Sequence, residues 1–259
     1  MSAVPLPIVD AGPEALFRVG RVYVDGDRVR GSMPVGPWLS GSDGLTTAGS
    51  LGVLIDNVLG YAIIASRPPD HWSVSTEITL DMIGDLAAAT GRLHAEATTV
   101  HADGLGGFAV GRVYDDAGTL VASCTQRGRF VPADRATVES PIVLDQVDDV
   151  DDLAGLVELD GHLLEVTPRL QNPMRNLHGG IAITVSDLVA AATLAATDGP
   201  PLVTASIHMA FLRPTPGGAH AAYTAQVLHR GRTSALVDVV GAVAGRVCTT
   251  ARVAAHPAQ

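Results

Sequence analysis

The sequence predicts an α+β fold in which one long helix, wrapped by a curved antiparallel sheet, occurs twice in the same chain. Three observations predict it: two helix-length windows that are apolar almost all round, a series of alternating β-like runs after each window, and an internal repeat that relates the two sets. A helix that is apolar on all faces is expected to be buried. Alternation with a period of two is typical of a strand with one covered face. We therefore expect two units of the same architecture.

The internal repeat is clearest at the predicted helices. Residues Thr47–Asp56 align with His178–Asp187 at an offset of 131, with small residues, apolar positions and the final Asp in register. Further along, Ser75–Ile83 aligns with Thr204–Leu212 at an offset of 129. The order is kept while the offset drifts by only two residues, which indicates a duplication followed by loop trimming.

The first block begins with a strand around Val29–Met33, followed by a loop rich in Gly and Pro. The apolar window after this loop predicts a helix over Ser50–Ala65. The four β-like runs that complete the block are Trp72–Ile83, Gly91–His101, Gly107–Tyr114 and Thr119–Phe130. The glycine-rich turn between the second and third runs is expected to close a β-hairpin, because no helix pattern follows it.

The second block repeats this order. A strand around Leu163–Thr167 leads through a loop rich in Pro and Asn into a helix expected over Gly179–Ala196. Its four β-like runs are Leu202–Leu212, Ala219–Leu228, Ser234–Val243 and Arg246–Val253. Alternating apolar residues in these runs mark one covered face of a sheet.

A strongly acidic segment separates the blocks. Residues 134–160 hold nine acidic residues and one Arg, whereas residues 161–259 hold four acidic residues and seven Arg, a balance of +3. A charge run between two apolar blocks predicts a solvated linker, here with one short helix around Val150–Val157. The predicted domains are residues 1–133 and 161–259, joined by the linker 134–160. The second domain is basic enough to hold an anionic ligand.

Composition excludes several classes of protein. The formal net charge is −10 without a basic run, so no nucleic-acid partner is expected. The two cysteines do not make a disulfide framework, and no His/Cys spacing indicates a metal. The first residues lack the features of a secretion signal, and the apolar windows are too short for a membrane span. We expect a cytoplasmic protein without a membrane partner, and self-association into a homo-oligomer is left open.

The loop from Asn172 to Gly180, with the sequence Asn-Pro-Met-Arg-Asn-Leu-His-Gly-Gly, is the most informative stretch. Two glycines at a helix start let a ligand approach the backbone and leave free N–H groups at the positive end of the helix. This arrangement can bind an anion or stabilise a developing oxyanion. The alternative is a tight loop whose glycines only permit positive φ angles.

Each predicted helix also contains one aspartate near its middle, Asp56 in the first and Asp187 in the second. A carboxylate inside an apolar helix is costly unless it has partners, so either a structural hydrogen bond or a function is expected. Gly179 and Asp187 are eight residues apart, which is about 12 Å along a helix. A site that uses both kinds of group therefore needs the helix start of one block and the aspartate of the other.

At these residues the chain resembles a known family. Asn172, His178-Gly179-Gly180 and Asp187 reproduce the Asn-x5-His-Gly-Gly-x6-Asp pattern of hotdog-fold acyl-CoA thioesterases of the phenylacetate-degradation type. Segments of the strands that follow also look like that family. The likeness covers the second block nearly end to end and the first block more weakly, which makes the chain similar to tandem double-hotdog members.

The resemblance implies a hydrolase of acyl-CoA thioesters that needs no cofactor, because coenzyme A is part of the substrate. In family dimers the site lies between the two subunits. Carried over to this chain, one composite site contains Asn172, His178 and Gly179 from the second block with Asp56 and Ser75 from the first.

A mirror site would pair Asp187 and Thr204 with the loop of the first block. In that loop the family's Asn, His and first Gly are replaced by Gly41, Thr47 and Ala48. One working site and one degenerate site are therefore expected.

The resemblance also suggests a role for each group. The Gly179 N–H would polarise the thioester carbonyl, and Asp56 would act as general base or as the direct nucleophile. Ser75 and Asn172 would orient the water, the carboxylate or the acyl carbonyl. His178 would shape the loop or assist the thioester.

Contacts to the coenzyme A part of the substrate are expected from Gly180, Arg230 and Arg232, with ordinary solvated turn arginines as the alternative for the last two. Two other functions remain open. A hotdog hydratase or dehydratase would need an acid–base pair for which the helix start offers no motif. A non-catalytic acyl-CoA-binding protein on the same scaffold is separated from an enzyme by assaying CoA release.

Overall fold

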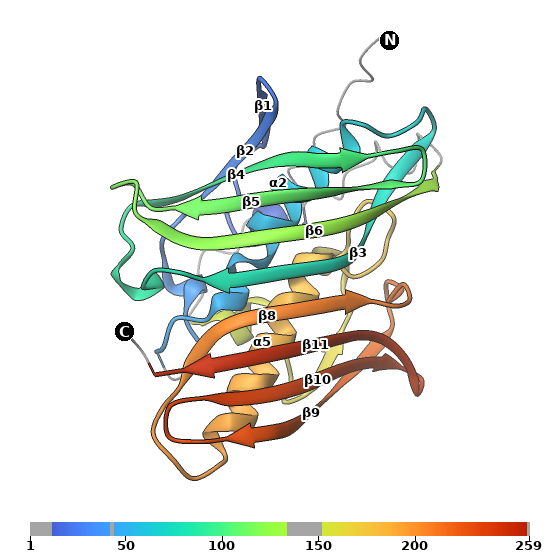
Figure 1. The fold of residues 1–259 in the computed structure, drawn as a ribbon. Coiled ribbons are helices and arrows are strands. Elements are labelled where there is room, and N and C mark those ends of the chain that lie inside the picture. Colours follow the sequence, from blue (N-terminus) through green and yellow to red (C-terminus); the bar gives the residue numbers. More distant parts are fainter. Residues whose placement is uncertain (1–11, 42–43, 134–151, 258–259) are drawn as a thin grey trace.

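In residues 12–41, 44–133 and 152–257, which the computed structural model describes, eleven strands form one continuous curved sheet (Figure 1). Their bounds are Tyr23–Asp25 (β1), Arg28–Pro34 (β2), His71–Met82 (β3), Arg92–Ala102 (β4), Gly106–Tyr114 (β5), Leu120–Pro132 (β6), Leu163–Glu165 (β7), Val203–Phe211 (β8), His220–Arg230 (β9), Ala235–Val243 (β10) and Arg246–His256 (β11). The strand order is β1-β2-β4-β5-β6-β3-β8-β11-β10-β9-β7. Neighbouring strands pair antiparallel throughout.

The two blocks use the same strand order on either side of the junction between β3 and β8. Outward from β3 the order is β6, β5, β4 and β2, and outward from β8 it is β11, β10, β9 and β7. At the junction, Glu77–Asp81 of β3 pairs with Ser206–Ala210 of β8, so the sheet continues from one block into the other. The repeated order is what the internal repeat predicts, and β1 is an addition to the first block.

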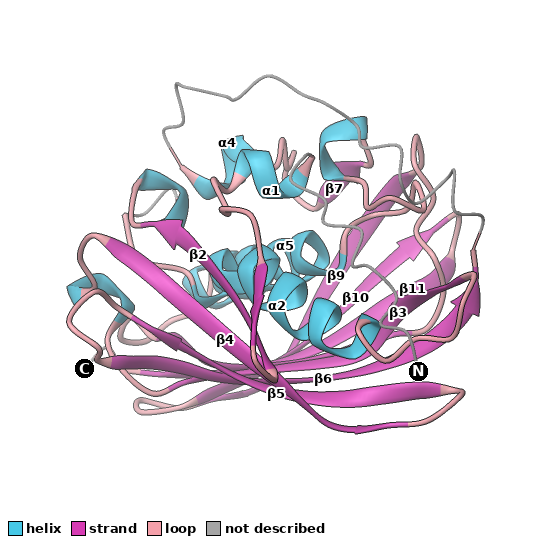
Figure 2. Ribbon diagram, turned by 90° about the horizontal axis from the view of Figure 1, so that it is seen from above, coloured by secondary structure: helices cyan, strands magenta, loops and turns pink. Residues whose placement is uncertain are grey.

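Two long helices lie side by side on the concave face of the sheet: α2, Gly52–Ile64, and α5, Gly179–Ala195 (Figure 2). Helix α2 packs on strands of the first block and α5 on strands of the second. Both lie where the sequence predicts them, except that the first begins as a 3₁₀ turn, Ala48–Leu51. Most residues of α2 are buried, including Leu54, Ile55 and Leu59, as expected of an apolar helix between a sheet and other elements.

Glycines let the start of each helix approach the other helix closely. A Cβ atom on Gly52 would collide with the carbonyl oxygen of Gly180, and a Cβ on Gly180 would lie 2.5 Å from the backbone of Val53. Only glycine fits at both positions. The close approach places the N-terminus of α5 against α2 within one turn of Asp56.

Short elements cover the other side of the helices (Figure 2). Helix α1, Pro13–Leu16, contacts α2 and the 3₁₀ turn Pro168–Leu170, which belongs to the second block. Of the predicted acidic linker, residues 134–151 lie outside the described residues. The described remainder contains helix α4, Leu153–Leu156, inside the window in which a short helix is predicted.

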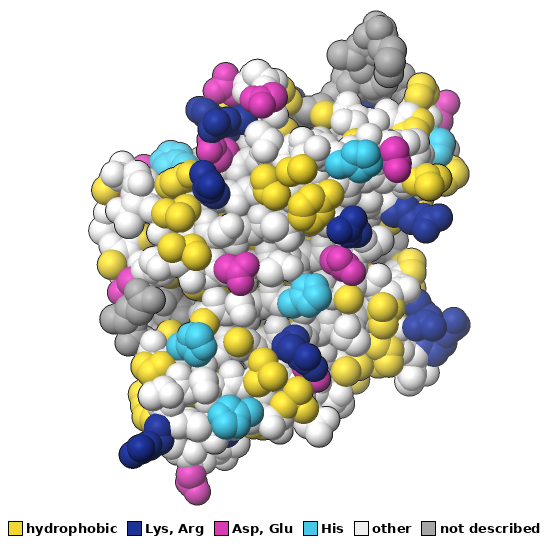
Figure 3. All heavy atoms as spheres, viewed as in Figure 1, with side chains coloured by type: hydrophobic (Ala, Val, Ile, Leu, Met, Phe, Trp, Pro, Cys, Tyr) yellow, Lys and Arg dark blue, Asp and Glu magenta, His cyan; other side chains and the backbone are white. Residues whose placement is uncertain are grey.

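The convex face of the sheet carries charged and histidine side chains spread between apolar ones (Figure 3). Among the described residues, no helix has both the length and the apolar character that a membrane crossing requires. The same residues contain no group of three or more His, Cys, Asp and Glu side chains placed to hold a metal ion.

Candidate active site

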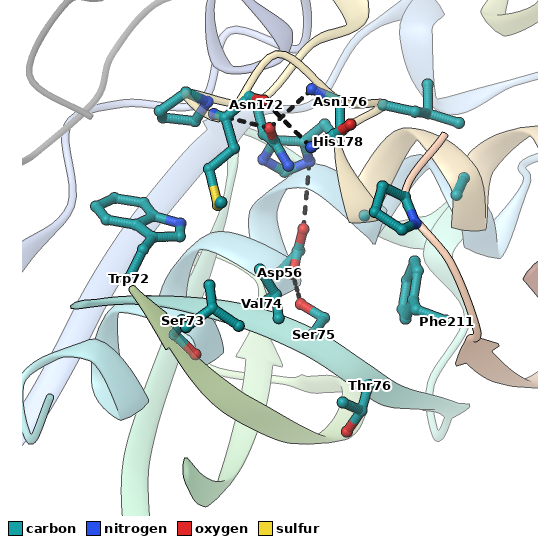
Figure 4. Close-up of a pocket in the computed structure, with 18 of the residues that line it drawn as sticks. Asp56, Trp72, Ser73, Val74, Ser75, Thr76, Asn172, Asn176, His178 and Phe211 are labelled. Carbon is teal, nitrogen blue, oxygen red and sulfur yellow. Dashed lines mark hydrogen bonds and ion pairs between the residues drawn. The ribbon is translucent and has the colours of Figure 1, made fainter. Parts of the chain in front are cut away.

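Asp56 projects from the middle of α2 and meets the start of α5. Its Oδ2 accepts a hydrogen bond from the Gly180 N–H at 3.0 Å, and its Oδ1 accepts one from the Ser75 hydroxyl at 3.0 Å. The side chain is 11% exposed. Asp56 and Ser75 come from the first block and Gly180 from the second, so the carboxylate is held between the blocks (Figure 4).

The Ser75 hydroxyl also accepts a hydrogen bond from a buried side-chain amide. Gln126 of β6 donates from Nε2 to the Ser75 hydroxyl oxygen at 2.9 Å, which directs the hydroxyl proton toward Asp56. A register shift between Ser75 and Glu77, opposite β6, marks a local irregularity of β3 at this point. Sequence reasoning missed Gln126. Its signal is a polar residue at an inward position of β6, in phase with the buried Cys124, Gly128 and Phe130.

His178 is the N-cap residue of α5 and lies beside the same carboxylate. Its Nδ1 accepts a hydrogen bond from the Gly180 N–H at 3.0 Å and lies 3.3 Å from Asp56 Oδ2. The opposite ring nitrogen, Nε2, lies 3.6 Å from Oε1 of Glu14. Because Nδ1 accepts in this arrangement, the neutral ring carries its proton on Nε2, facing Glu14.

Glu14 is a buried carboxylate that sequence reasoning missed. It lies on α1 and its side chain is only 5% exposed. Burial by itself lowers the pKa of His178, but the bond to Glu14 and the negative charges of Asp56 and Glu14 outweigh it, so the pKa of His178 is raised. No local pattern reveals Glu14, because its partner lies in the other block and only the tertiary fold joins them.

Asn172 organises the loop before α5 rather than pointing its oxygen at Asp56. Its Oδ1 accepts hydrogen bonds from the backbone N–H groups of Met174 at 3.0 Å and Asn176 at 3.2 Å. Inside this tight turn Arg175 has a φ of 58°. The turn sets the path of the chain into His178 and Gly179.

Gly179 is the first residue of α5 and lies against the carboxylate. A Cβ at this position would lie 2.6 Å from Asp56 Oδ2, so any other residue would displace one of the two groups. The first N–H groups of a helix have no partner within the helix. No partner for the Gly179 N–H is found among the described residues either, which leaves it available to a ligand in the cavity that Gly179 lines.

A cavity of about 470 Å³ opens at these groups. Five of the predicted site residues line it: Asp56, Ser75, Asn172, His178 and Gly179. In Figure 4, Trp72 lies to one side of Asp56 and Phe211 to the other, so the cavity extends in both directions from the carboxylate.

Of the three residues predicted to contact coenzyme A, Gly180 lies at Asp56, and the two arginines lie away from the residues that line the cavity. Gly180 is buried and its N–H is directed at Asp56 and His178. Arg230 donates to the carbonyl oxygen of Pro200 at 2.7 Å. In the sheet Arg230 pairs with Ala235 of β10, Ala235 pairs with Ala255 of β11, and Ala255 pairs with Thr204 of β8. Arg230 is therefore at the Thr204 end of the second block, whereas the cavity lies at the opposite end of β8.

Neither Arg230 nor its neighbour Arg232 is among the residues that line the cavity, so the structure does not bring them to Asp56. Arg213, which follows β8, is exposed and does line the cavity. The sequence comparison placed the arginines by block and could not show at which end of the block they lie.

The mirror site keeps its carboxylate and both hydrogen-bond donors, but it lacks the histidine and does not line the cavity. Asp187 accepts hydrogen bonds from the Gly49 N–H at 2.7 Å and the Thr204 hydroxyl at 2.5 Å, the equivalents of Gly180 and Ser75. It is fully buried, and this burial, only partly offset by the two hydrogen bonds, raises its pKa to about 6. Thr47 stands where the other site has His178, and neither Asp187 nor Thr204 lines the cavity.

Comparisons with known proteins relate both blocks to thioesterases. Residues 14–130 match the family model of the acyl-CoA thioesterase C-terminal domain, and residues 174–247 match that of the thioesterase superfamily. No curated protein sequence gives a match.

Several solved structures share the fold over nearly their whole length. The 12:0-ACP thioesterase from Umbellularia californica is 12% identical, with a TM-score of 0.60 over 90% of this chain and 95% of that one. A protein from Thermobifida fusca described as a thioesterase II is 15% identical, with a TM-score of 0.62 over 96% and 98%. The tesB protein from Mycobacterium avium subs paratuberculosis is 8% identical, with a TM-score of 0.61 over 91% and 95%. The chain therefore has the hotdog fold found in thioesterases.

Proposed function

We propose that the protein is a tandem double-hotdog acyl-CoA thioesterase that hydrolyses its substrate at the Asp56 site, between the two blocks. The observation that carries the proposal is a carboxylate of one block held by the helix start of the other, at the wall of a cavity. The matches of both blocks to thioesterase family models support it. The Asn-His-Gly-Gly-Asp pattern of the second block supports a relationship to the phenylacetate-degradation type.

The Gly179 N–H polarises the thioester. A carbonyl oxygen bound at the start of α5 receives this N–H and the positive end of the helix, which stabilise the oxyanion of the tetrahedral intermediate. The acceptor of the neighbouring Gly180 N–H is already fixed, because it bonds to Asp56 and His178. One N–H therefore serves the substrate while the next one anchors the carboxylate.

Asp56 acts as general base for the attacking water. It takes one proton as the water oxygen forms its bond to the carbonyl carbon, and it returns the proton to sulfur as the carbon–sulfur bond breaks. Ser75 and Gly180 each donate to one oxygen of Asp56 and fix its direction. The products are the free acid and CoA, and no cofactor takes part in this scheme.

The assay is CoA release from a panel of acyl-CoA thioesters, followed with a thiol reagent. We expect turnover with the unaltered protein and a loss of turnover with Asp56→Asn. Binding of acyl-CoA without release of CoA would show that the protein is an acyl-CoA-binding protein and not a thioesterase. Loss of an enoyl or hydroxyacyl chromophore without CoA release would indicate a hydratase or dehydratase.

A single-turnover reaction in ¹⁸O-labelled water separates the two roles of Asp56. A general base leaves the label in the product acid from the first turnover. A direct nucleophile forms a mixed anhydride, and water that opens this anhydride at the carbonyl carbon of Asp56 leaves label in the Asp56 carboxylate.

A further inference from the structure

One side of the cavity follows helix α2 away from Asp56. Residues Asp56, Gly60 and Ile64 recur every four positions and so share one face of the helix. All three line the cavity, as does Tyr61. Eight residues of helix span about 12 Å, which gives the length of this part of the cavity, here called the acyl arm.

The acyl arm is walled by apolar side chains from four elements. Its apolar lining residues are Gly60, Tyr61, Ile64, Trp72, Val74, Val131, Pro132 and Met174, and the polar residues Ser73 and Gln126 line the cavity beside them. Tyr61 is 5% exposed and Ile64 2% exposed. Tyr61 and Trp72 pack edge to face with ring centroids 6.5 Å apart, which makes a fixed aromatic wall.

The other side of the cavity differs in chemistry. It is lined by Phe211, Leu212, Arg213, Pro214 and Thr215, which follow the end of β8. Leu212, Arg213 and Pro214 are exposed, so this side reaches solvent and carries a positive charge. A thioester at Asp56 therefore has one direction along α2, where Tyr61 and Ile64 are buried, and one direction past the exposed Arg213, on opposite sides of the carboxylate (Figure 4).

Gly60 keeps the acyl arm open. The nearest atom to a Cβ built on Gly60 would be Gln126 Nε2 at 3.6 Å, and no other atom lies within 4 Å. The space in front of Gly60 is therefore open, unlike the space in front of Gly52 and Gly180, where two helices touch. At the equivalent positions α5 has Ala191, Ala192 and Ala195 instead of Gly60, Tyr61 and Ile64.

We propose that the acyl arm binds the acyl group of the substrate, that this group is apolar and of medium length, and that Gly60 sets how much of it fits. The proposal rests on the proposed thioesterase function and goes further by naming the acyl class and the residue that selects it. Burial of each further methylene against the arm stabilises the bound acyl group, so kcat/KM is expected to rise with chain length until the arm is full.

The test is to fill the arm at Gly60. Acetyl-, butyryl-, hexanoyl-, octanoyl-, decanoyl-, palmitoyl- and phenylacetyl-CoA are assayed with the unaltered protein, Gly60→Ala and Gly60→Leu. We expect kcat/KM to rise from acetyl to octanoyl or decanoyl and then fall. Gly60→Leu is expected to lower kcat/KM for decanoyl-CoA at least tenfold relative to acetyl-CoA, since one methylene more or less in a hydrophobic pocket is worth about 10–200-fold. Gly60→Ala, which also favours the helix, shifts the profile in the same direction by less.

Ala191→Leu is the matched control, because it adds the same bulk at the equivalent position of α5. It is expected to leave the chain-length profile unchanged. Equal losses for all acyl groups in Gly60→Leu, or a profile that Gly60→Leu leaves intact, would overturn the assignment of the arm while leaving the thioesterase activity standing.

Binding of decanoate tests the arm without turnover. In a Trp38→Phe background, Trp72 is the remaining tryptophan, and its emission reports a ligand in the arm. We expect saturable binding that Gly60→Leu weakens at least tenfold and Ala191→Leu leaves unchanged. An absence of CoA release from every thioester would contradict the proposed function, whereas an absence of this binding would contradict the arm.

Discussion

The Asp56 and Asp187 sites start from the same repeated pattern and differ in what surrounds the carboxylate. Each aspartate accepts one backbone N–H from the opposite helix start and one hydroxyl from the adjacent strand. Asp56 also faces His178 and an open cavity, whereas Asp187 is fully buried without either. The two aspartates therefore share the hydrogen bonds that the repeated architecture supplies, and they differ in the loop beside the carboxylate and in access to a cavity.

Among variants outside the two aspartates, Gly179→Ala is expected to have the largest effect on this comparison. The added methyl group would fall on Asp56 Oδ2 and push apart the N–H donor and the base. Misplacement of a catalytic group by about 1 Å costs about 10²-fold, so we expect kcat to fall by that factor or more. The equivalent of Gly179 in the mirror site is already Ala48, so the comparison variant is made at the next residue. Gly49→Ala would bring a methyl group within 2.7 Å of the Asp187 Cβ and is expected to reduce stability while folded protein keeps most of its kcat. Similar kcat losses in the two folded variants would show that both sites contribute.

Glu14→Gln sharpens the role of His178. The amide oxygen still accepts from His178 Nε2, but the negative charge is lost, so the raised pKa of His178 falls. We expect the limb of the pH–rate profile that reports His178 to move to lower pH, and kcat to fall by less than the roughly tenfold that loss of a whole hydrogen bond of about 1.4 kcal/mol would cost. Glu14→Ala, which removes the acceptor as well, should lose more. An unchanged pH profile in Glu14→Gln would contradict a role for Glu14 through His178.

Asp187→Asn tests the buried copy through stability. The pKa of Asp187 is raised to about 6 from 3.8, so the folded state prefers the protonated acid. Stability from this group is full below pH 4 and is lost as the pH rises toward 6. An asparagine keeps both hydrogen bonds without titrating, because its amide can donate to Thr204 and accept from Gly49. We expect the free energy of unfolding of the variant, measured with denaturant, to increase relative to that of the unaltered protein as the pH rises from 4 to 8, by up to about 3 kcal/mol. A constant difference across this range would refute the buried titration.

The arginines give the smallest expected effect. Arg213→Ala is expected to raise KM for acyl-CoA by about two- to fivefold, the scale of one exposed charge contact, and to leave KM for an acyl-pantetheine thioester unchanged. Arg230→Ala with Arg232→Ala should leave both constants within error, because these side chains lie at the other end of the sheet. A KM effect from the double variant alone would restore the assignment made from the sequence.

The sequence predicts the repeated architecture because periodicity and repeats are local signals. Helix α2, helix α5 and the use of one strand order in both blocks follow from apolar windows and an alignment of one block on the other, whereas the order itself comes from the structure. The cross-block placement of Asp56 follows from the length of a helix alone, since eight residues separate Gly179 from Asp187.

Glu14, Gln126 and the position of Arg230 could not be predicted in the same way. Glu14 meets His178 only because α1 crosses to the second block, and no short-range pattern encodes that crossing. Gln126 is an isolated polar residue in an inward register, a signal that gains meaning only once Ser75 is seen beside it. The place of Arg230 depends on strand register across β8, β9, β10 and β11, which the sequence of one strand does not contain.

The most direct measurement of the central claim is kcat for Asp56→Asn and Asp187→Asn, side by side, on folded protein with one acyl-CoA substrate. If hydrolysis occurs where the α5 start meets Asp56, Asp56→Asn loses about 10²–10⁴-fold, the contribution of a positioned base, while Asp187→Asn stays within a few-fold of the unaltered protein. Near-normal turnover in Asp56→Asn together with a large loss in Asp187→Asn would contradict the account and place the reaction in the buried copy.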